Sequence, residues 1–144
     1  MKYFASILIL SMIIWSCKTP QETMPKNTTG ESVKSNDTVR IANDDIEYEI
    51  IIIEPGFNAW LVSTARPEGY YSQSFLEARN LQYVIAYNQR VMQPQAYNPN
   101  LYEMRIDYQQ GIDYGYEVNY KLYNYFIYFQ LKYNQQLAGW VPRI

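Results

Sequence analysis

Hydrophobic and polar positions divide the chain into three parts. Residues 3–15 form an uncharged, mostly apolar run, residues 18–40 are almost entirely polar, and the remainder shows the apolar periodicities of folded protein. We therefore predict a lipoprotein signal peptide at 1–16, a lipidated cysteine followed by a disordered tether at 17–40, and one globular domain at 41–144. A domain of about a hundred residues has room for a single hydrophobic core.

Within the globular part, two stretches have the pattern of strands. Tyr48–Ile53 ends in a run of isoleucines, which predicts a strand buried on both faces at its end. Leu101–Tyr108 alternates apolar with charged residues, as a half-buried strand does. We expect these strands to pair, in either direction. A short helix at Phe57–Thr64 should carry Trp60 and Leu61 inward.

Two longer helices follow from the 3.6-residue period. Ser74 and Glu77 have the spacing of a capping box, so a helix should begin there and end before Pro94. Its inward face consists of Leu76, Asn80, Tyr83, Val84, Tyr87 and Val91. A last helix at Tyr116–Leu137 is apolar around most of its circumference, so we expect it to be the packing centre. Its narrow polar stripe consists of Glu117, Lys121, Asn124, Lys132 and Gln135.

The predicted fold class is therefore α+β. It is a small single domain with two or three short strands packed against two main helices, after a signal peptide and a flexible tether. The chain's net charge of −2 and its lack of a basic cluster exclude nucleic-acid binding. The absence of histidine excludes Ser-His-Asp and Cys-His nucleophile systems, and it removes the commonest zinc ligand. We therefore expect the protein to have no enzymatic activity and to bind no cofactor or metal ion.

The apolar run at the start has the features of a lipoprotein signal. As a helix its 13 residues would span about 20 Å, which is short of the roughly 30 Å of a bilayer core. It ends at Ile14–Cys17, which resembles the bacterial lipoprotein signal except at Trp15. We expect membrane lipid on Cys17, with a short uncleaved anchor and ordinary secretion as alternatives. Because Lys18 replaces the aspartate of inner-membrane retention, we expect the periplasmic face of the outer membrane.

Candidate binding residues come from the chain's 16 tyrosines, because tyrosine combines a flat apolar face with a polar tip. We predict a surface that binds an envelope protein or glycan, made of Tyr70, Tyr71, Tyr97, Tyr102 and Tyr114; the alternative is that these rings belong to the core. Asp37-Thr38-Val39 resembles a bacterial O-glycosylation acceptor, which makes Thr38 a candidate modification site, with a chance match as the alternative.

Carboxylates provide the other candidates. Asp107, Asp113 and Glu117 lie close together in the sequence, where a glycosidase-like pair could form, although Asp113 is also placed to complement a helix start. A calcium site from Asn43, Asp44 and Asp45 is disfavoured, because calcium loops take ligands from alternate positions.

Several longer runs resemble an uncharacterised family of Bacteroidota envelope lipoproteins, a domain of unknown function. They cover most of residues 48–137 and are Pro55–Phe57, Tyr70–Ser74, Arg90–Met92, Tyr97–Tyr102, Ile112–Gly115 and Val118–Phe126. The resemblance implies a lipoprotein signal and a compact domain, without an assigned activity or catalytic residues. We therefore expect a membrane-anchored envelope lipoprotein that acts as a non-enzymatic binding or structural module; a carboxylate-dependent hydrolase of envelope polysaccharide is the alternative.

Overall fold

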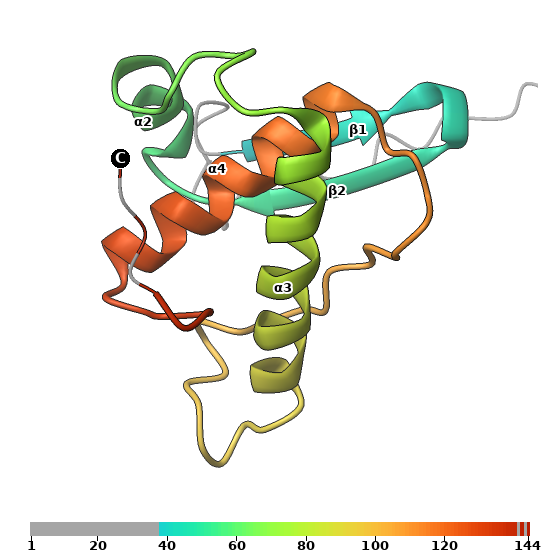
Figure 1. The fold of residues 1–144 in the computed structure, drawn as a ribbon. Helices are drawn as coiled ribbons and strands as arrows, with labels where there is room; N and C mark the ends of the chain where they lie inside the picture. Colours follow the sequence, from blue (N-terminus) through green and yellow to red (C-terminus); the bar gives the residue numbers. More distant parts are fainter. Residues whose placement is uncertain (1–37, 141, 143) are drawn as a thin grey trace, which may run out of the picture. The chain divides into compact units, whose positions relative to one another are not determined.

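The computed structural model describes residues 38–140, 142 and 144 (Figure 1). This part of the chain contains a two-stranded antiparallel sheet and three α-helices, which confirms the predicted α+β class. None of these helices combines the length and hydropathy needed to cross a bilayer. The elements in order are β1 (Thr38–Asn43), the 3-10 helix η2 (Asp44–Ile46), β2 (Tyr48–Ile53), α2 (Phe57–Ser63), α3 (Gln73–Val91) and α4 (Tyr116–Lys132).

The two strands form a hairpin that is closed by η2. Thr38 lies opposite Ile53 and Asn43 opposite Tyr48. The turn is stabilised because the Asn43 side chain accepts a hydrogen bond from Asp45 N at 2.9 Å. Glu47 ends η2 in the left-handed conformation, with φ at 52°, and returns the chain into β2.

The hairpin corrects three sequence-based predictions. Strand β2 pairs with β1 and not with Leu101–Tyr108, which forms no strand. β1 includes residues 38–40, which we had placed in the tether; they extend the strand because Val39 and Ile41 alternate into the core. β2 is buried on one face only, since Ile51 and Ile53 point away from the helices.

Helix α3 begins two residues earlier than the capping box predicts. Ser72 caps it, because its hydroxyl oxygen accepts a hydrogen bond from Phe75 N at 3.3 Å. Glu77 instead accepts a hydrogen bond from the Gln73 side chain at 2.8 Å. The inward face is as predicted, with five buried residues: Leu76, Asn80, Tyr83, Val84 and Tyr87. The short helix α2 also forms, with Phe57 fully buried.

Helix α4 is the packing centre, as predicted, and it contacts α2, α3 and β1. It ends at Lys132 rather than Leu137, and Asn134 follows in the left-handed conformation with φ at 50°. Eleven of its residues are buried. They include Asn124, which we had placed in the polar stripe; it is accommodated because its side-chain amide donates to Tyr120 O at 2.9 Å.

Tyrosine hydroxyls attach the connecting segments to this core. Tyr48 donates to Asp107 O at 2.6 Å, Tyr120 to Arg66 O at 2.7 Å and Tyr128 to Pro55 O at 2.7 Å. In each case the ring packs against other apolar side chains while the hydroxyl satisfies a loop carbonyl. Much of the tyrosine content therefore has a structural role.

Candidate functional site

A cleft of about 490 Å³ runs beside strand β2, and its volume is typical of ligand sites. The four isoleucines of β2, Ile50–Ile53, line it together with residues of the segment 100–106. Tyr87 from α3 and two residues of α4, Tyr125 and Phe129, complete the lining. Most of these side chains are apolar, so the cleft suits an apolar ligand.

The lining shows that the cleft follows one edge of β2. Ile50 and Ile52 point toward the core, whereas Ile51 and Ile53 point away from it. A cavity that touches side chains on both faces of a strand must lie along its edge. β1 occupies the other edge, and within residues 38–140 no third strand joins the sheet. The cleft therefore follows an edge whose main-chain N–H and C=O groups lack a strand partner there.

A charged pair borders the cleft where β2 ends. Glu54 is only 5% exposed, and its Oε1 accepts hydrogen bonds from Lys132 Nζ at 2.7 Å and from the Tyr133 hydroxyl at 3.1 Å. Burial alone would lower the pKa of Lys132, but the hydrogen bond and charge of Glu54 outweigh it and raise that pKa. Lys132 is therefore charged at neutral pH, and its contact with Glu54 ties the end of β2 to α4.

Two buried phenols in the lining stay neutral. Burial raises the pKa of Tyr87 to about 12, and it raises the pKa of Tyr125 as well. Both hydroxyls therefore remain protonated at physiological pH and can donate or accept a hydrogen bond. They lie in a lining that also contains the polar side chains of Asn100, Glu103 and Arg105.

Three large apolar side chains at the cleft are exposed to solvent. Ile51 is 55% exposed, Ile53 61% and Met104 70%. Exposed apolar residues that gather around a groove are typical of interaction sites, whereas single ones are ordinary. This arrangement can bind an apolar or extended ligand.

A second cleft, of about 560 Å³, lies between α3 and the segment 108–113. Gln73 Nε2 donates to Glu77 Oε1 at 2.8 Å and to Asp113 Oδ1 at 2.7 Å, so one amide joins two carboxylates. Asp113 Oδ1 also accepts from Gly115 N at 3.0 Å, directly before α4. Asp113 therefore lies just before the start of α4, as its sequence context indicated, although Gly115 is the N-cap and no side chain caps the helix.

The other two of the three candidate carboxylates lie elsewhere. Asp107 accepts a hydrogen bond from Gln109 Nε2 at 3.2 Å, and Glu117 forms an exposed ion pair with Lys121 at 2.6 Å. No hydrogen bond among the described residues joins Asp107, Asp113 and Glu117 through a common partner. The structure instead places Asp113 beside Glu77.

The predicted tyrosine surface does not form. Tyr102 and Tyr114 are 3% and 2% exposed, so their assignment to a binding surface is wrong; both rings pack in the core. Tyr70 and Tyr71 are neighbours, with ring centroids 4.7 Å apart. Tyr97 lies beyond the other end of α3, which has 19 residues and a length of about 28 Å. The exposed rings are therefore divided between two places.

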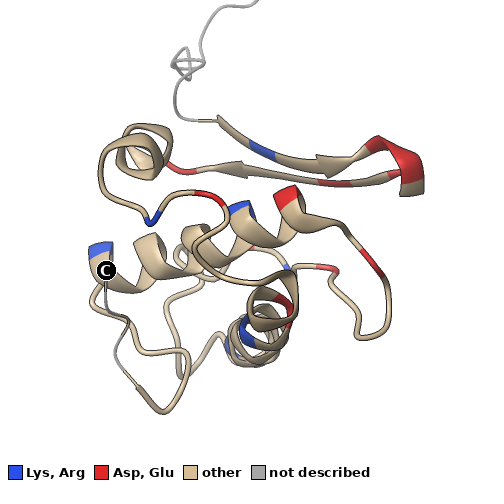
Figure 2. Ribbon diagram, turned by 45° about the horizontal axis from the view of Figure 1, so that its top comes forward, with Lys and Arg blue, Asp and Glu red and all other residues tan. Residues whose placement is uncertain are grey.

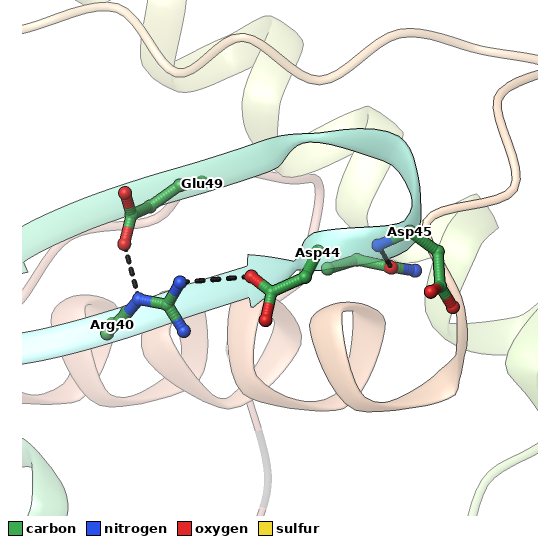
Figure 3. Close-up of polar contacts among 5 residues, drawn as sticks. Arg40, Asp44, Asp45 and Glu49 are labelled. Carbon is green, nitrogen blue, oxygen red and sulfur yellow. Dashed lines mark hydrogen bonds and ion pairs between the residues drawn. The ribbon is translucent and has the colours of Figure 1, made fainter.

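The candidate calcium ligands are used within the hairpin turn. Arg40 donates to Glu49 and, at 3.1 Å, to Asp44 Oδ1 (Figure 3). The Asn43 side chain is occupied with Asp45 N and with Tyr114 O. Over the described residues, no group of three or more acidic, cysteine or histidine side chains could hold a metal ion.

Of the two candidate modification sites, the structure describes only Thr38. Cys17 lies outside the described residues. Thr38 begins β1 opposite Ile53, and the next residue, Val39, is buried. The Thr38 side chain is therefore on the outer face of the hairpin, whereas its carbonyl accepts a hydrogen bond from Asn58 Nδ2 at 3.1 Å.

Sequence reasoning missed the two features that define the main cleft. The free edge of β2 became visible only when its partner proved to be β1. The role of Glu54 depends on Lys132, which is 78 residues away. The one local signal was an acidic residue between the isoleucine run and Pro55, a position that favours a strand end.

Comparison with known proteins gives one match. A family model described as "Family of unknown function (DUF6146)" matches residues 5–141, which is nearly the whole chain. No curated protein and no solved structure matches the sequence. The match therefore groups this chain with its relatives without assigning an activity to them.

Proposed function

The chain belongs to DUF6146, a family of unknown function, and we propose that it is a non-enzymatic binding module anchored in the cell envelope. The anchor is lipid on Cys17, and the expected location is the periplasmic face of the outer membrane. The sequence at Ile14–Cys17 supports this anchor. The observation that carries the binding role is the apolar cleft along the free edge of β2.

The energetics of the cleft support binding. Fully burying an aliphatic side chain contributes about 1.5–3 kcal/mol, so three half-exposed ones could contribute several kcal/mol when a partner covers them. Ile51, Ile53 and Met104 are in this position. The exposed side chains of Glu103 and Arg105 also line the cleft and add polar groups that can fix a ligand's orientation.

The chemistry of the lining supports a role without catalysis. Among the residues that the structure describes, no serine, cysteine or histidine lines this cleft. Its buried carboxylate, Glu54, is already held by Lys132 and Tyr133. The cleft thus offers contact area and hydrogen-bonding groups, and it has no nucleophile with an adjacent base.

Photo-crosslinking in intact cells tests the binding role. A photoreactive phenylalanine analogue replaces Met104 at the cleft, or Val62 in α2 as the control. Both positions are exposed, so the substitution should leave the fold intact. We expect a discrete adduct with an envelope protein from position 104 only. Adducts that are absent from both positions, or equal at both, contradict the proposal.

Metabolic labelling with an alkyne-tagged fatty acid tests the anchor. The wild-type chain should incorporate label and fractionate with membranes, whereas Cys17→Ala should lose the label and become extractable without detergent. Lys18→Ala is the matched control, since it changes the adjacent position and keeps the thiol. Labelling that survives Cys17→Ala contradicts lipid attachment at this cysteine.

A carboxylate hydrolase is the second candidate, and the Glu77 and Asp113 pair in the second cleft favours it. Glycoside hydrolysis uses two carboxyl groups that flank the scissile bond. The purified chain should then release reducing ends from cell-wall polysaccharide, and Glu77→Gln should abolish this release. Asp107→Asn is the control, because Asp107 does not contact the pair. Absence of release by the wild-type chain rules out this candidate for that substrate.

A further inference from the structure

The free edge of β2 faces the segment 100–106 across the cleft. Asn88 on α3 holds Ile106 by two bonds: its Oδ1 accepts from Ile106 N at 2.9 Å, and its Nδ2 donates to Ile106 O at 2.8 Å. The main-chain groups of Ile106 therefore point toward α3. In an extended chain the main-chain N–H and C=O groups of the adjacent residues point the opposite way.

The contact made by Asp107 confirms this alternation. Its main-chain oxygen accepts a hydrogen bond from the Tyr48 hydroxyl at 2.6 Å, and Tyr48 is the first residue of β2. The main chain at Asp107 thus faces β2. By the same alternation, the main-chain groups of Arg105 also face the cleft, which Arg105 lines.

Within the described residues, β2 and the segment 105–108 are not paired as neighbouring strands. Directly paired strands lie about 4.8 Å apart and exchange main-chain hydrogen bonds. Across the described residues, no main-chain hydrogen bond joins β2 to the segment 105–108. The phenol of Tyr48 spans the space at one end, and the cleft of about 490 Å³ occupies it from Ile50 to Glu54. The free edge of β2 therefore borders an open cleft at the place where an added strand would lie.

The charge of the hairpin indicates which kind of strand fits. Residues 38–54 carry five carboxylates and one basic residue, Arg40. Figure 2 shows the acidic residues concentrated at the turn between β1 and β2. Arg40 is engaged by Asp44 and Glu49, whereas no ion pair is formed by Asp45 or Glu47 within this part of the chain. Electrostatic complementarity therefore favours a basic partner.

On these grounds, and resting on the binding role proposed above, we propose that the cleft takes an extended basic segment of a partner protein. The segment adds to the free edge of β2 by main-chain hydrogen bonds and lies between β2 and residues 100–106. Its apolar side chains cover Ile51, Ile53 and Met104, and its basic side chains extend toward the acidic turn. Strand addition of this kind derives affinity from the main chain and specificity from alternate side chains.

Peptide titration of the full chain, purified in detergent, tests this mode of binding. The probe is a capped peptide of alternating valine and lysine that matches the six residues of β2 in length. We expect saturable binding by fluorescence anisotropy. The same peptide with alternate backbone nitrogens methylated should bind at least about tenfold more weakly, because each blocked N–H leaves a carbonyl without a partner. A peptide of valine and glutamate should bind more weakly too.

Matched protein variants locate the site. Ile53→Lys places a cation at the cleft and should weaken peptide binding about tenfold, whereas Val62→Lys makes the same change in charge on α2, at a position that does not line the cleft, and should have a smaller effect. Equal binding of the methylated peptide, equal binding of the acidic peptide, or equal effects of the two variants each overturns the proposal.

Two further results separate this inference from the binding role itself. A concentration-dependent dimer that Ile53→Lys dissociates would mean that a second copy of this chain fills the edge, and the proposed partner segment would be wrong. A crosslink from position 104 in cells, together with no peptide binding, overturns strand addition alone and leaves the binding role in place. If neither the crosslink in cells nor the peptide binding is observed, both the binding role and strand addition are overturned.

Discussion

Lys132 Nζ donates a hydrogen bond of 2.7 Å to Glu54 Oε1 and thereby joins the last residue of α4 to the end of β2. The carboxylate is almost fully buried, whereas the Lys132 side chain is about one-third exposed, at 32%. Lys132 also donates to Pro55 O at 2.9 Å, so the cation holds both the strand end and the turn that follows it. One border of the cleft depends on this contact.

Replacing the buried carboxylate should therefore destabilise the fold. Glu54→Gln should lower the free energy of unfolding by about 1–3 kcal/mol, because it removes the charge that compensates Lys132. Urea unfolding measures this change. Glu117→Gln removes the exposed pair with Lys121 and should cost less than about 0.5 kcal/mol. Equal effects of the two variants would show that burial adds nothing to the Glu54 pair.

The side chain of Asn88 acts as a strand partner for Ile106, since it satisfies both main-chain groups of that residue. Asn88→Ala should lower the free energy of unfolding by about 2–3 kcal/mol, because it leaves an N–H and a C=O without partners. Gln89→Ala, at the adjacent exposed position of α3, is the control and should change stability by less than about 0.5 kcal/mol. Hydrogen exchange should show faster exchange of the Ile106 amide in Asn88→Ala only.

Gly56 combines backbone strain with a close contact. Its φ is 86°, and a Cβ at this position would lie 2.8 Å from the Tyr128 hydroxyl oxygen. Gly69 has a φ of 82° with nothing within 4 Å, so Gly69→Ala tests strain alone and should cost about 1–2 kcal/mol. Gly56→Ala should cost about 1–2 kcal/mol more, because Tyr128 must move and release Pro55 O. Thermal unfolding of the two variants checks this order.

Buried phenols should make the fold sensitive to alkali. Burial raises the pKa of Tyr87 and of Tyr108 to about 12, above the value of 10.0 expected for an unfolded chain. Because the pKa of these tyrosines is higher in the folded state than in the unfolded chain, their contribution to stability is complete below pH 10 and is lost as the pH rises toward 12. Urea unfolding between pH 8 and about 11.5 should show this loss, with a shallower slope for Tyr87→Phe. A Tyr87→Phe curve that overlays the wild-type curve would contradict the assignment.

The sequence predicts the elements whose signals are local. The inward face of α3 follows from apolar spacing, and Phe57–Ser63 and Tyr116–Lys132 were found as helices within a few residues of their ends. The local signals did not identify the N-cap of α3, because two nearby serines can both provide it. Ser72 and Ser74 can both cap a helix, and the chain uses Ser72, whose hydroxyl reaches Phe75 N.

The strand pairing and the candidate site could not be predicted, because both depend on distant residues. Leu101–Tyr108 has the alternation of a strand, but the side chain of Asn88 takes the main-chain groups that a ladder would use. Composition placed Thr38 in the tether, whereas the burial of Val39 makes that stretch a strand. Tyrosine content indicated a surface, yet the number of tyrosines does not show which rings face inward.

The position of α4 along the chain affects how the protein is made. This helix packs against α2, α3 and β1, all of which precede it, so a ribosome completes them before their common partner emerges. Most of the core then has nothing to pack against until α4 has emerged, so the domain cannot complete its fold before that point of synthesis. Until then the apolar faces of α2, α3 and β1 stay accessible to chaperones.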